Sequence, residues 1–125
     1  MTRILIIDDE VEATKMLSDF LSSRGYETIT ATDGDEGIRK LDKEKPDLVI
    51  CDIKMPKKDG FQFLQETRAS RHWIPVIIVS ALNEPVDILK GYNLEADYYI
   101  TKPINLEEVL KAVQIMTSLI PLRKK

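Results

Sequence analysis

Along the chain, short apolar runs alternate with segments in which apolar residues recur every three or four positions. Residues 4–7, 48–51 and 76–79 are continuous apolar runs rich in β-branched residues, which are typical of strands buried on both faces of a parallel sheet. Residues 26–31 alternate more weakly, and residues 97–101 complete a set of five predicted strands. The segments between and after the strands have helical spacing. The pattern therefore predicts five strands that alternate with five helices.

The ends of the predicted helices coincide with residues that favour helix termini. The predicted caps or first residues are Asp33, Asp59, Pro85 and Asn105, and the predicted stops are Gly25 and Pro46. The fourth helix carries apolar residues at Val86, Leu89 and Tyr92. Short loops between alternating strands and helices favour parallel strands joined by right-handed crossovers. We therefore expect an α/β fold with a doubly wound parallel sheet and helices on both faces.

Composition places the chain among ordinary single-domain globular proteins. Its 125 residues are 43% hydrophobic and 31% charged, so it can bury a sizeable core and does not have the composition of a disordered chain. The formal net charge of −3 gives no electrostatic footprint for nucleic acid, and the basic triplet at residues 123–125 is expected to be a solvated tail. The single cysteine, Cys51, excludes an internal disulfide and fits a reducing compartment.

The sequence gives no indication of a membrane segment. Its uninterrupted apolar runs are far shorter than the about 20 residues that a membrane-spanning helix needs. The run at residues 4–7 is also too short for the core of a signal peptide, and no small-residue cleavage site follows it. We therefore expect a cytoplasmic protein.

Polar residues stand at the carboxyl ends of the predicted strands, which is where α/β sheets bind ligands. Asp8 and Asp9 follow the first strand and Asp52 follows the third, while Ser80 ends the fourth and Lys102 follows the fifth. Clustered carboxylates raise one another's pKa unless a cation joins them, and carboxylate oxygens with room for water suit Mg²⁺. A carboxylate beside a metal, an ammonium and a hydroxyl can attack phosphorus to form an aspartyl phosphate. The set therefore predicts a phosphoryl-binding site.

An ordered set of short motifs resembles that of a known family. The motifs are Asp8-Asp9, Asp52, Met55-Pro56, Asp59-Gly60, Ser80-Ala81 and Lys102-Pro103. In this order they resemble the receiver domain of two-component response regulators, the family that includes the chemotaxis regulators. The resemblance implies a receiver domain at residues 1–120 with a flavodoxin-like sheet of order 2-1-3-4-5. Residues 121–125 are then a tail or the start of a linker, and the apolar residues 116–122 either continue the last helix toward an output domain or pack on a partner.

The resemblance implies that Asp52 is the site of phosphorylation. Asp52 is expected to take a phosphoryl group from a phosphohistidine of a sensor histidine kinase or a histidine phosphotransfer protein. Mg²⁺ is expected to be held by Asp8, Asp9, Asp52 and the main-chain carbonyl of Lys54. The domain is thus expected to catalyse its own phosphorylation rather than to turn over a substrate, and an output domain or effector protein is expected to read its state.

The resemblance also implies residues that respond to the modification. Lys102 is expected to pair with the phosphoryl group, and the Lys102-Pro103 peptide bond is expected to be cis. Ser80 is expected to move and hydrogen-bond the phosphoryl group, while Tyr99 swings inward in concert. These movements are expected to remodel the surface formed by the fourth helix, the fifth strand and the fifth helix.

Some positions depart from the commonest pattern of the family. Lys54 places a cation two residues after the phosphoacceptor, at a position that varies in the family and tunes dephosphorylation. Leu82 has no polar group that could position a hydrolytic water, so self-dephosphorylation is expected to be slow. Glu95 stands where a glycine usually precedes the Ala-Asp pair, so a slightly different backbone is expected there. DNA-binding members with a winged-helix output often dimerise through an acidic pair in the fifth strand and an arginine in the fifth helix. Tyr98 and Ala112 stand at those places, which weakens that dimer as a prediction.

Other interpretations stay open at this point. A phosphatase that forms an aspartyl phosphate also places a nucleophilic aspartate after a strand, but it would need an aspartate in place of Lys54 and a cap domain for which there is no room. A docking module that works without phosphorylation would be expected to have lost an acid or the lysine. A nucleotide-binding fold is disfavoured because no glycine-rich loop follows the first strand. The one histidine, His72, is expected at the surface, away from the site.

Overall fold

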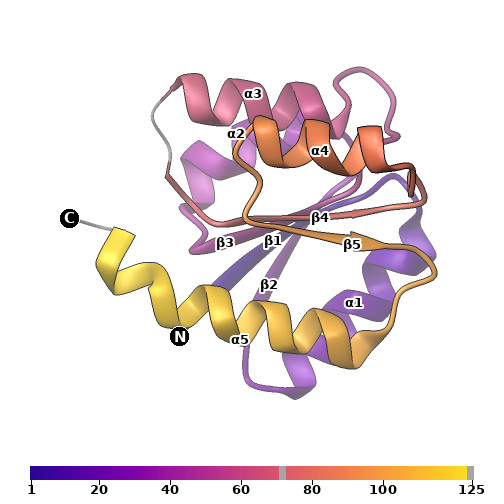
Figure 1. The fold of residues 1–125 in the computed structure, drawn as a ribbon. Helices are drawn as coiled ribbons and strands as arrows, with labels where there is room; N and C mark the ends of the chain where they lie inside the picture. The colour runs from indigo at the N-terminus through magenta and orange to yellow at the C-terminus, as the bar shows by residue number, and fades with distance from the viewer. Residues whose placement is uncertain (71–72, 124–125) are drawn as a thin grey trace.

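A parallel sheet runs through the middle of the molecule, with helices on both of its faces (Figure 1). The computed structural model describes residues 1–70 and 73–123. Within these residues the strands are β1 (Arg3–Ile7), β2 (Glu27–Ala31), β3 (Leu48–Cys51), β4 (Val76–Ser80) and β5 (Tyr98–Thr101). They pair in parallel in the order β2-β1-β3-β4-β5. The predicted doubly wound, flavodoxin-like sheet of five strands is thus confirmed for the described part of the chain.

The helices lie on opposite faces of the sheet because the chain reverses its direction across it. They are α1 (Val11–Ser23), α2 (Gly34–Glu44), α3 (Gly60–Ala69), α4 (Pro85–Asn93) and α5 (Leu106–Arg123). The step from β1 to β2 runs one way across the sheet, and the later steps run the other way. Right-handed crossovers then place α1 on one face and α2, α3 and α4 on the other, with α5 returning beside α1 (Figure 1).

Each central strand contributes side chains to two hydrophobic cores. Leu5 and Ile7 belong to the core under α2, α3 and α4, whereas Ile4 and Ile6 belong to the core shared with α1 and α5. Successive side chains of a strand point to opposite faces, and all four of these are buried. A strand buried on both faces reads as a continuous apolar run, which is why these runs were recognisable in the sequence.

The predicted helix termini are formed by the expected residues. Asp33, Asp59 and Asn105 each accept a hydrogen bond from the main-chain N–H three residues later. Gly25 lies just beyond α1 with a φ of 92°, in the left-handed region that favours glycine. The caps fix where each helix begins and therefore how the loops that carry the site are connected.

Helix α4 turns its predicted apolar residues toward solvent. Val86, Leu89 and Tyr92 are 70%, 59% and 45% exposed. The helix meets the sheet instead through Ile88, which packs against the core, and through Gly91, which is buried. An apolar outer face is consequently exposed next to β5.

Two expectations concern the ends of the described segments. Helix α5 continues to Arg123, past residue 120, so the division of the chain at that residue stays a prediction. His72 lies outside the described residues, and its predicted position at the surface also stays a prediction. Among the described residues, no helix combines the length and apolar character that crossing a membrane requires.

Candidate functional site

Polar residues from neighbouring strands meet at one edge of the sheet. Asp8, Asp52 and Lys102 directly follow β1, β3 and β5, and Ser80 is the last residue of β4. Because β1, β3, β4 and β5 are adjacent in the sheet, their carboxyl ends lie side by side. A hollow of about 190 Å³ opens there, and Asp52, Ser80 and Lys102 are among the residues that line it. The structure thus brings the predicted strand-end residues into one site.

Lys102 joins the carboxylates of this site. Its Nζ lies 3.3 Å from Oδ2 of Asp8 and 3.2 Å from Oδ2 of Asp52. The same atom lies 3.1 Å from Oε1 of Glu10. Burial by itself would lower the pKa of Lys102, but the charges of Asp52 and Asp8 and the bond to Glu10 outweigh it, so the pKa is raised. Lys102 is therefore an ammonium ion throughout the physiological pH range. The Lys102-Pro103 peptide bond is cis, as predicted.

The carboxylate of Asp52 is buried, with Asp52 only 5% exposed, and hydrogen bonds fix its orientation. Its Oδ1 accepts a hydrogen bond from the N–H of Ile53 at 2.7 Å, which leaves Oδ2 toward Lys102. Burial raises the pKa of Asp52 and the charge of Asp8 raises it further, while Lys102 and the Ile53 bond offset only part of the rise. The carboxylate is thus tolerated in the interior mainly because a cation and a main-chain donor face it.

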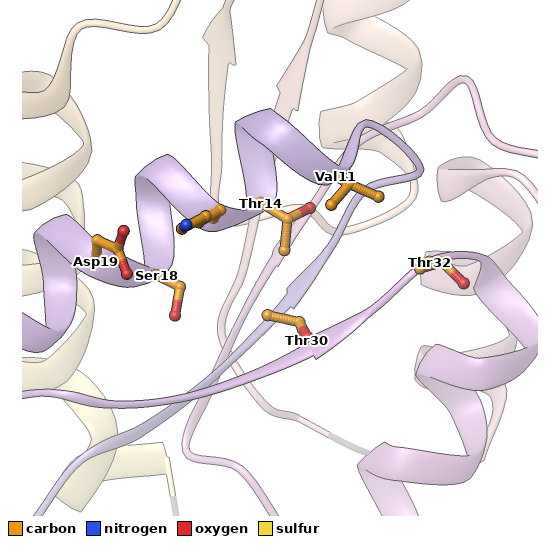
Figure 2. Close-up of a pocket in the computed structure, with 7 residues that line it drawn as sticks. Val11, Thr14, Ser18, Asp19, Thr30 and Thr32 are labelled. Atoms are coloured by element: carbon orange, nitrogen blue, oxygen red, sulfur yellow. The ribbon is translucent and has the colours of Figure 1, made fainter.

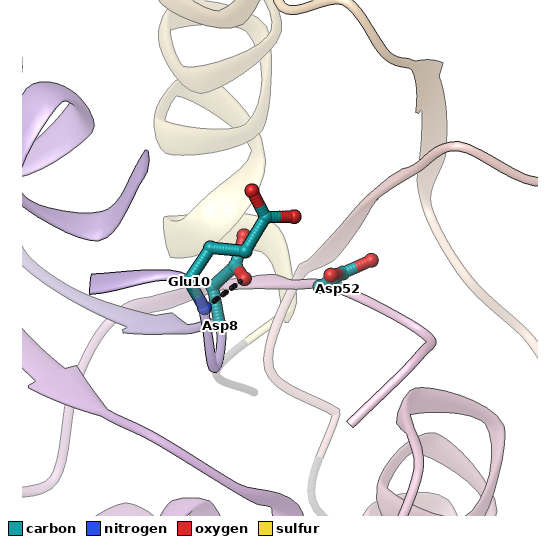
Figure 3. Close-up of side chains that lie close together, drawn as sticks. All are labelled: Asp8, Glu10 and Asp52. Carbon is teal, nitrogen blue, oxygen red and sulfur yellow. Dashed lines mark hydrogen bonds between the residues drawn. The ribbon is translucent and has the colours of Figure 1, made fainter. Parts of the chain in front are cut away.

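Asp8 repeats the arrangement of Asp52. Its Oδ1 accepts a hydrogen bond from the main-chain N–H of Glu10 at 2.9 Å, the dashed line in Figure 3, and its Oδ2 faces Lys102. Behind it, the buried hydroxyl of Thr14 donates to the main-chain carbonyls of Asp8 and Glu10 at 3.2 and 3.1 Å. Thr14 of α1 therefore stabilises the turn after β1 through these hydrogen bonds.

The carboxylates form an oxygen cluster that could hold a cation. Among the described residues, ligand atoms of Asp8, Glu10 and Asp52 lie within 4.8 Å of one another (Figure 3). Asp9, which was predicted to be a direct metal ligand, is exposed and lines the same hollow, but its carboxylate is not part of the cluster. The ligand roles of Asp9 and of the Lys54 carbonyl stay predictions.

Glu10 is the site residue that sequence reasoning missed. The run of three adjacent acids after β1 was visible, but the pattern cannot tell which of the side chains turns toward Asp52. The contact of Glu10 with Lys102 becomes evident only when the end of β5 is placed beside the end of β1.

Leu82 connects the two predicted switch residues through its main chain. Ser80 is fully buried, and its Oγ accepts a hydrogen bond from the N–H of Leu82 at 3.1 Å. The hydroxyl of Tyr99 donates to the carbonyl of Leu82 at 2.7 Å. Tyr99 is 8% exposed, so its ring lies inward in this structure. The side chain of Leu82 packs on the core and adds no polar group.

The main chain that follows Asp52 is fixed by the start of α3. The N–H of Gly60 donates to the carbonyl of Ile53 at 2.8 Å. A Cβ at position 60 would lie 2.3 Å from the main-chain oxygen of Asp52, so glycine is required for this close approach. The Sγ of Cys51 donates to the same oxygen at 3.1 Å, and burial raises the pKa of the thiol well above its usual value. Cys51 is therefore an inert buried thiol.

A second hollow, of about 280 Å³, lies between α1 and β2 (Figure 2). Its lining includes the hydroxyls of Thr14, Ser18 and Thr30. Thr14 is committed to the turn after β1, and Ser18 shares a hydrogen bond of 2.6 Å with Thr28. This hollow is larger than the strand-end hollow, but its lining has a single carboxylate, that of Asp19, beside Lys15. The cluster of carboxylates around one ammonium is at the strand ends, so we place the candidate site there.

Comparison with known proteins identifies a family with this fold. Residues 4–114 match the response regulator receiver domain family. The chain belongs to this family. The receiver domain resembles solved members closely: a CheY-like receiver domain protein from Methanospirillum hungatei superposes with a TM-score of 0.91 at 28% identity over 97% of both chains. The motif-based resemblance is thereby confirmed.

Curated relatives of the receiver domain are longer proteins. It is 38% identical over 107 residues to the alkaline phosphatase synthesis transcriptional regulatory protein PhoP of Bacillus subtilis. It is 41% identical over 107 residues to the transcriptional regulatory protein RprY of Bacteroides fragilis. The matches cover 86% of this chain and 45% of each relative, so the chain spans just under half the length of these proteins. Family membership disfavours the phosphatase interpretation.

Proposed function

We propose that this receiver domain accepts a phosphoryl group on Asp52 from a phosphohistidine of a sensor histidine kinase or a histidine phosphotransfer protein. The observation that carries the proposal is the contact of Lys102 Nζ with both Asp52 and Asp8 at the mouth of one hollow. A docking module without phosphorylation would have no need for two buried carboxylates and an ammonium in contact. Family membership supports the same function.

In the proposed reaction, an oxygen of Asp52 attacks phosphorus and the P–N bond to the donor imidazole breaks. The electron pair of that bond returns to the imidazole nitrogen. This nitrogen then takes up a proton from solvent, and the product is a neutral imidazole ring. Lys102 is close enough to exchange the Asp52 oxygen for an anionic oxygen of the phosphoryl group. Ser80, on the wall of the hollow, can donate its hydroxyl to another of these oxygens. Little proton transfer by the protein is needed, since positioning and charge dominate phosphoryl transfer.

The donor set of the site fits a hard divalent cation. Carboxylate oxygens are the ligands that Mg²⁺ takes in proteins, usually few of them beside several waters, and those of Asp8, Glu10 and Asp52 lie together. We infer that Asp8, Asp9, Asp52 and the main-chain carbonyl of Lys54 would hold Mg²⁺, with Glu10 as a further candidate. The bound ion would neutralise charge on the carboxylates and on the phosphoryl oxygens.

The proposed partners that read the modification are an output domain or an effector protein. The chain covers 45% of relatives that are named transcriptional regulatory proteins. The surface of α4, β5 and α5 is the proposed place of contact because Tyr99 of β5 links the site to it, and Val86 and Leu89 of α4 are exposed there. We propose that the domain works in the cytoplasm.

Phosphorylation of the isolated domain tests this proposal. The protein is incubated with Mg²⁺ and acetyl phosphate, in which the P–O bond to acetate breaks instead of the P–N bond. Intact mass spectrometry is expected to show one phosphoryl adduct that hydroxylamine removes, since acyl phosphates are cleaved by this nucleophile. The adduct is expected to be lost in Asp52→Ala and when EDTA replaces Mg²⁺.

A matched aspartate variant provides the control. Asp19→Asn removes an exposed carboxylate of α1 and is expected to keep the adduct. An adduct that persists in Asp52→Ala would overturn the assignment of the phosphoacceptor. Steady release of phosphate from small phosphate esters would instead restore the phosphatase interpretation.

A further inference from the structure

Gly91 is an interior residue of α4 for which the helix itself gives no reason. Glycine is the least favourable residue in a helix interior after proline, because it leaves the unfolded chain with the most freedom. The backbone at Gly91 does not lie in the left-handed region, so its dihedral angles do not require glycine. Among the described residues of α4, Gly91 is the buried one, and it faces strand residues of the sheet. The requirement is therefore one of space.

The side chain of Tyr99 occupies the space that a residue at position 91 would need. A Cβ on Gly91 would lie 3.0 Å from Cδ2 and 3.3 Å from Cε2 of the Tyr99 ring. It would also lie 3.3 Å from Cδ1 of Ile78. Ile78 is the partner of Tyr99 in the register of β4 and β5, and both belong to the same core. The ring is thus enclosed by α4 on one side and by β4 on the other.

The other end of the Tyr99 side chain is anchored at the site. Its hydroxyl donates to the carbonyl of Leu82, whose N–H donates in turn to Oγ of Ser80. The ring is therefore held by a hydrogen bond at its hydroxyl and faces α4 and Ile78 along its edge. A side chain at position 91 and the bond between Tyr99 and Leu82 compete for the position of one ring.

We propose that Gly91 is a positioning residue for Tyr99: its missing side chain forms the seat that holds the ring inward, against Ile78 and in reach of Leu82. Any larger residue at position 91 pushes the ring outward and separates it from Leu82. Helix α4 and Tyr99 then no longer move together. The consequence for signalling rests on the proposed phosphorylation of Asp52, whereas the seat itself does not.

A double-mutant cycle tests the seat without any phosphodonor. Gly91→Ala is expected to lower the midpoint of thermal unfolding in the natural background, because the ring and its hydrogen bond are displaced. In a Tyr99→Ala background the same substitution is expected to raise the midpoint, because the added methyl group enters vacated space and alanine favours the helix. Equal effects in the two backgrounds, of either sign, would overturn the proposal.

The position of the ring is measured directly by NMR on protein with labelled tyrosine and isoleucine. Contacts between the Tyr99 ring and the Ile78 methyl group are expected in the natural protein and in Asn93→Val, which alters an exposed residue of the same helix. They are expected to be lost in Gly91→Val. Retention of these contacts in a folded Gly91→Val protein would contradict the seat.

Addition of Mg²⁺ and acetyl phosphate separates the seat from the proposed function. Gly91→Val is expected to gain the adduct on Asp52 while its Tyr99 signals no longer respond to it. A Tyr99 response equal to that of the natural protein would overturn the positioning role. Failure of the natural protein to form the adduct would overturn the proposed function alone, and the cycle would still decide whether the seat exists.

Discussion

Single side chains at the strand ends work against the stability of the fold. Asp52 and Asp8 are 5% and 4% exposed and face each other across the ammonium of Lys102. Buried like charges are unfavourable unless a cation and hydrogen bonds compensate for them. Lys102 compensates in part, because the pKa of Asp52 is still raised above its usual value, chiefly by burial. The site therefore keeps these buried carboxylates at a cost in folding free energy.

This cost predicts that Asp52→Asn stabilises the protein at neutral pH. Because the pKa of Asp52 is raised in the folded state, protonation of its carboxyl group favours folding. This stabilisation is fully present below the usual pKa of 3.8 and is lost as the pH rises through the raised pKa. Thermal unfolding is measured from pH 3 to pH 8. The midpoint of Asp52→Asn is expected to exceed that of the natural protein at pH 7, and the gap is expected to close toward pH 3. A lower midpoint at pH 7 would mean that Lys102 more than compensates for burial.

Leu82 also leads to a prediction for the lifetime of the proposed phosphoryl adduct. Leu82 uses its N–H and carbonyl for Ser80 and Tyr99 and presents no polar side-chain group to a water molecule. Loss of the phosphoryl adduct, followed by intact mass after removal of the donor, is therefore expected to take minutes or longer. Leu82→Asn, which adds such a group, is expected to shorten the lifetime. A half-life of seconds for the natural protein would contradict this prediction.

At the scale of elements, the connection from α4 to β5 depends on a buried arginine of α3. Arg68 is 8% exposed, and its Nε and Nη2 donate to the carbonyl of Glu95 at 3.1 and 2.8 Å. It also donates to the carbonyl of Ile74 at 2.7 Å and to Asp97 at 3.0 Å. Glu95 has a φ of 71°, which glycine adopts without strain. Arg68 thus holds Glu95 in a strained, left-handed turn. The glycine that the family pattern leads one to expect at position 95 would adopt this turn without strain.

Relief of this strain predicts that Glu95→Gly stabilises the domain. A left-handed conformation costs a residue other than glycine roughly 1–2 kcal/mol, and the greater freedom of glycine in the unfolded chain returns about 0.5–1 kcal/mol. The free energy of unfolding in urea is expected to rise by up to about 1.5 kcal/mol. Glu95→Ala keeps the Cβ and is expected to give no gain. A gain of similar size in both variants would assign the effect to the lost charge instead of the backbone.

At the scale of the whole molecule, the sheet and its order could be predicted because buried parallel strands need continuous apolar runs. The strand-end residues Asp8, Asp52, Ser80 and Lys102 followed from those runs, because each stands where a run stops. The order of strands came with the motif resemblance and not from the runs themselves. The sequence alone therefore predicted the strands and helices and the edge of the sheet that carries the site.

The remaining features depend on contacts between distant segments. In α4, the exposed positions Val86 and Leu89 and the inward positions Ile88 and Gly91 have similar helical spacing, so the pattern alone cannot choose the inner face. The burial of Arg68 becomes understandable only when its partners from other segments, two main-chain carbonyls and the carboxylate of Asp97, are in place. Such choices are made by packing, which a linear pattern does not contain.

The free edge of β2 has a consequence for how the domain behaves among copies of itself. Side chains of α2 already occupy hydrogen-bonding groups of this edge: Lys40 donates to the carbonyl of Thr30, and Glu36 accepts from the N–H of Thr32. A strand from another molecule would have to displace both before it could extend the sheet. The domain is thereby protected from edge-to-edge aggregation at β2.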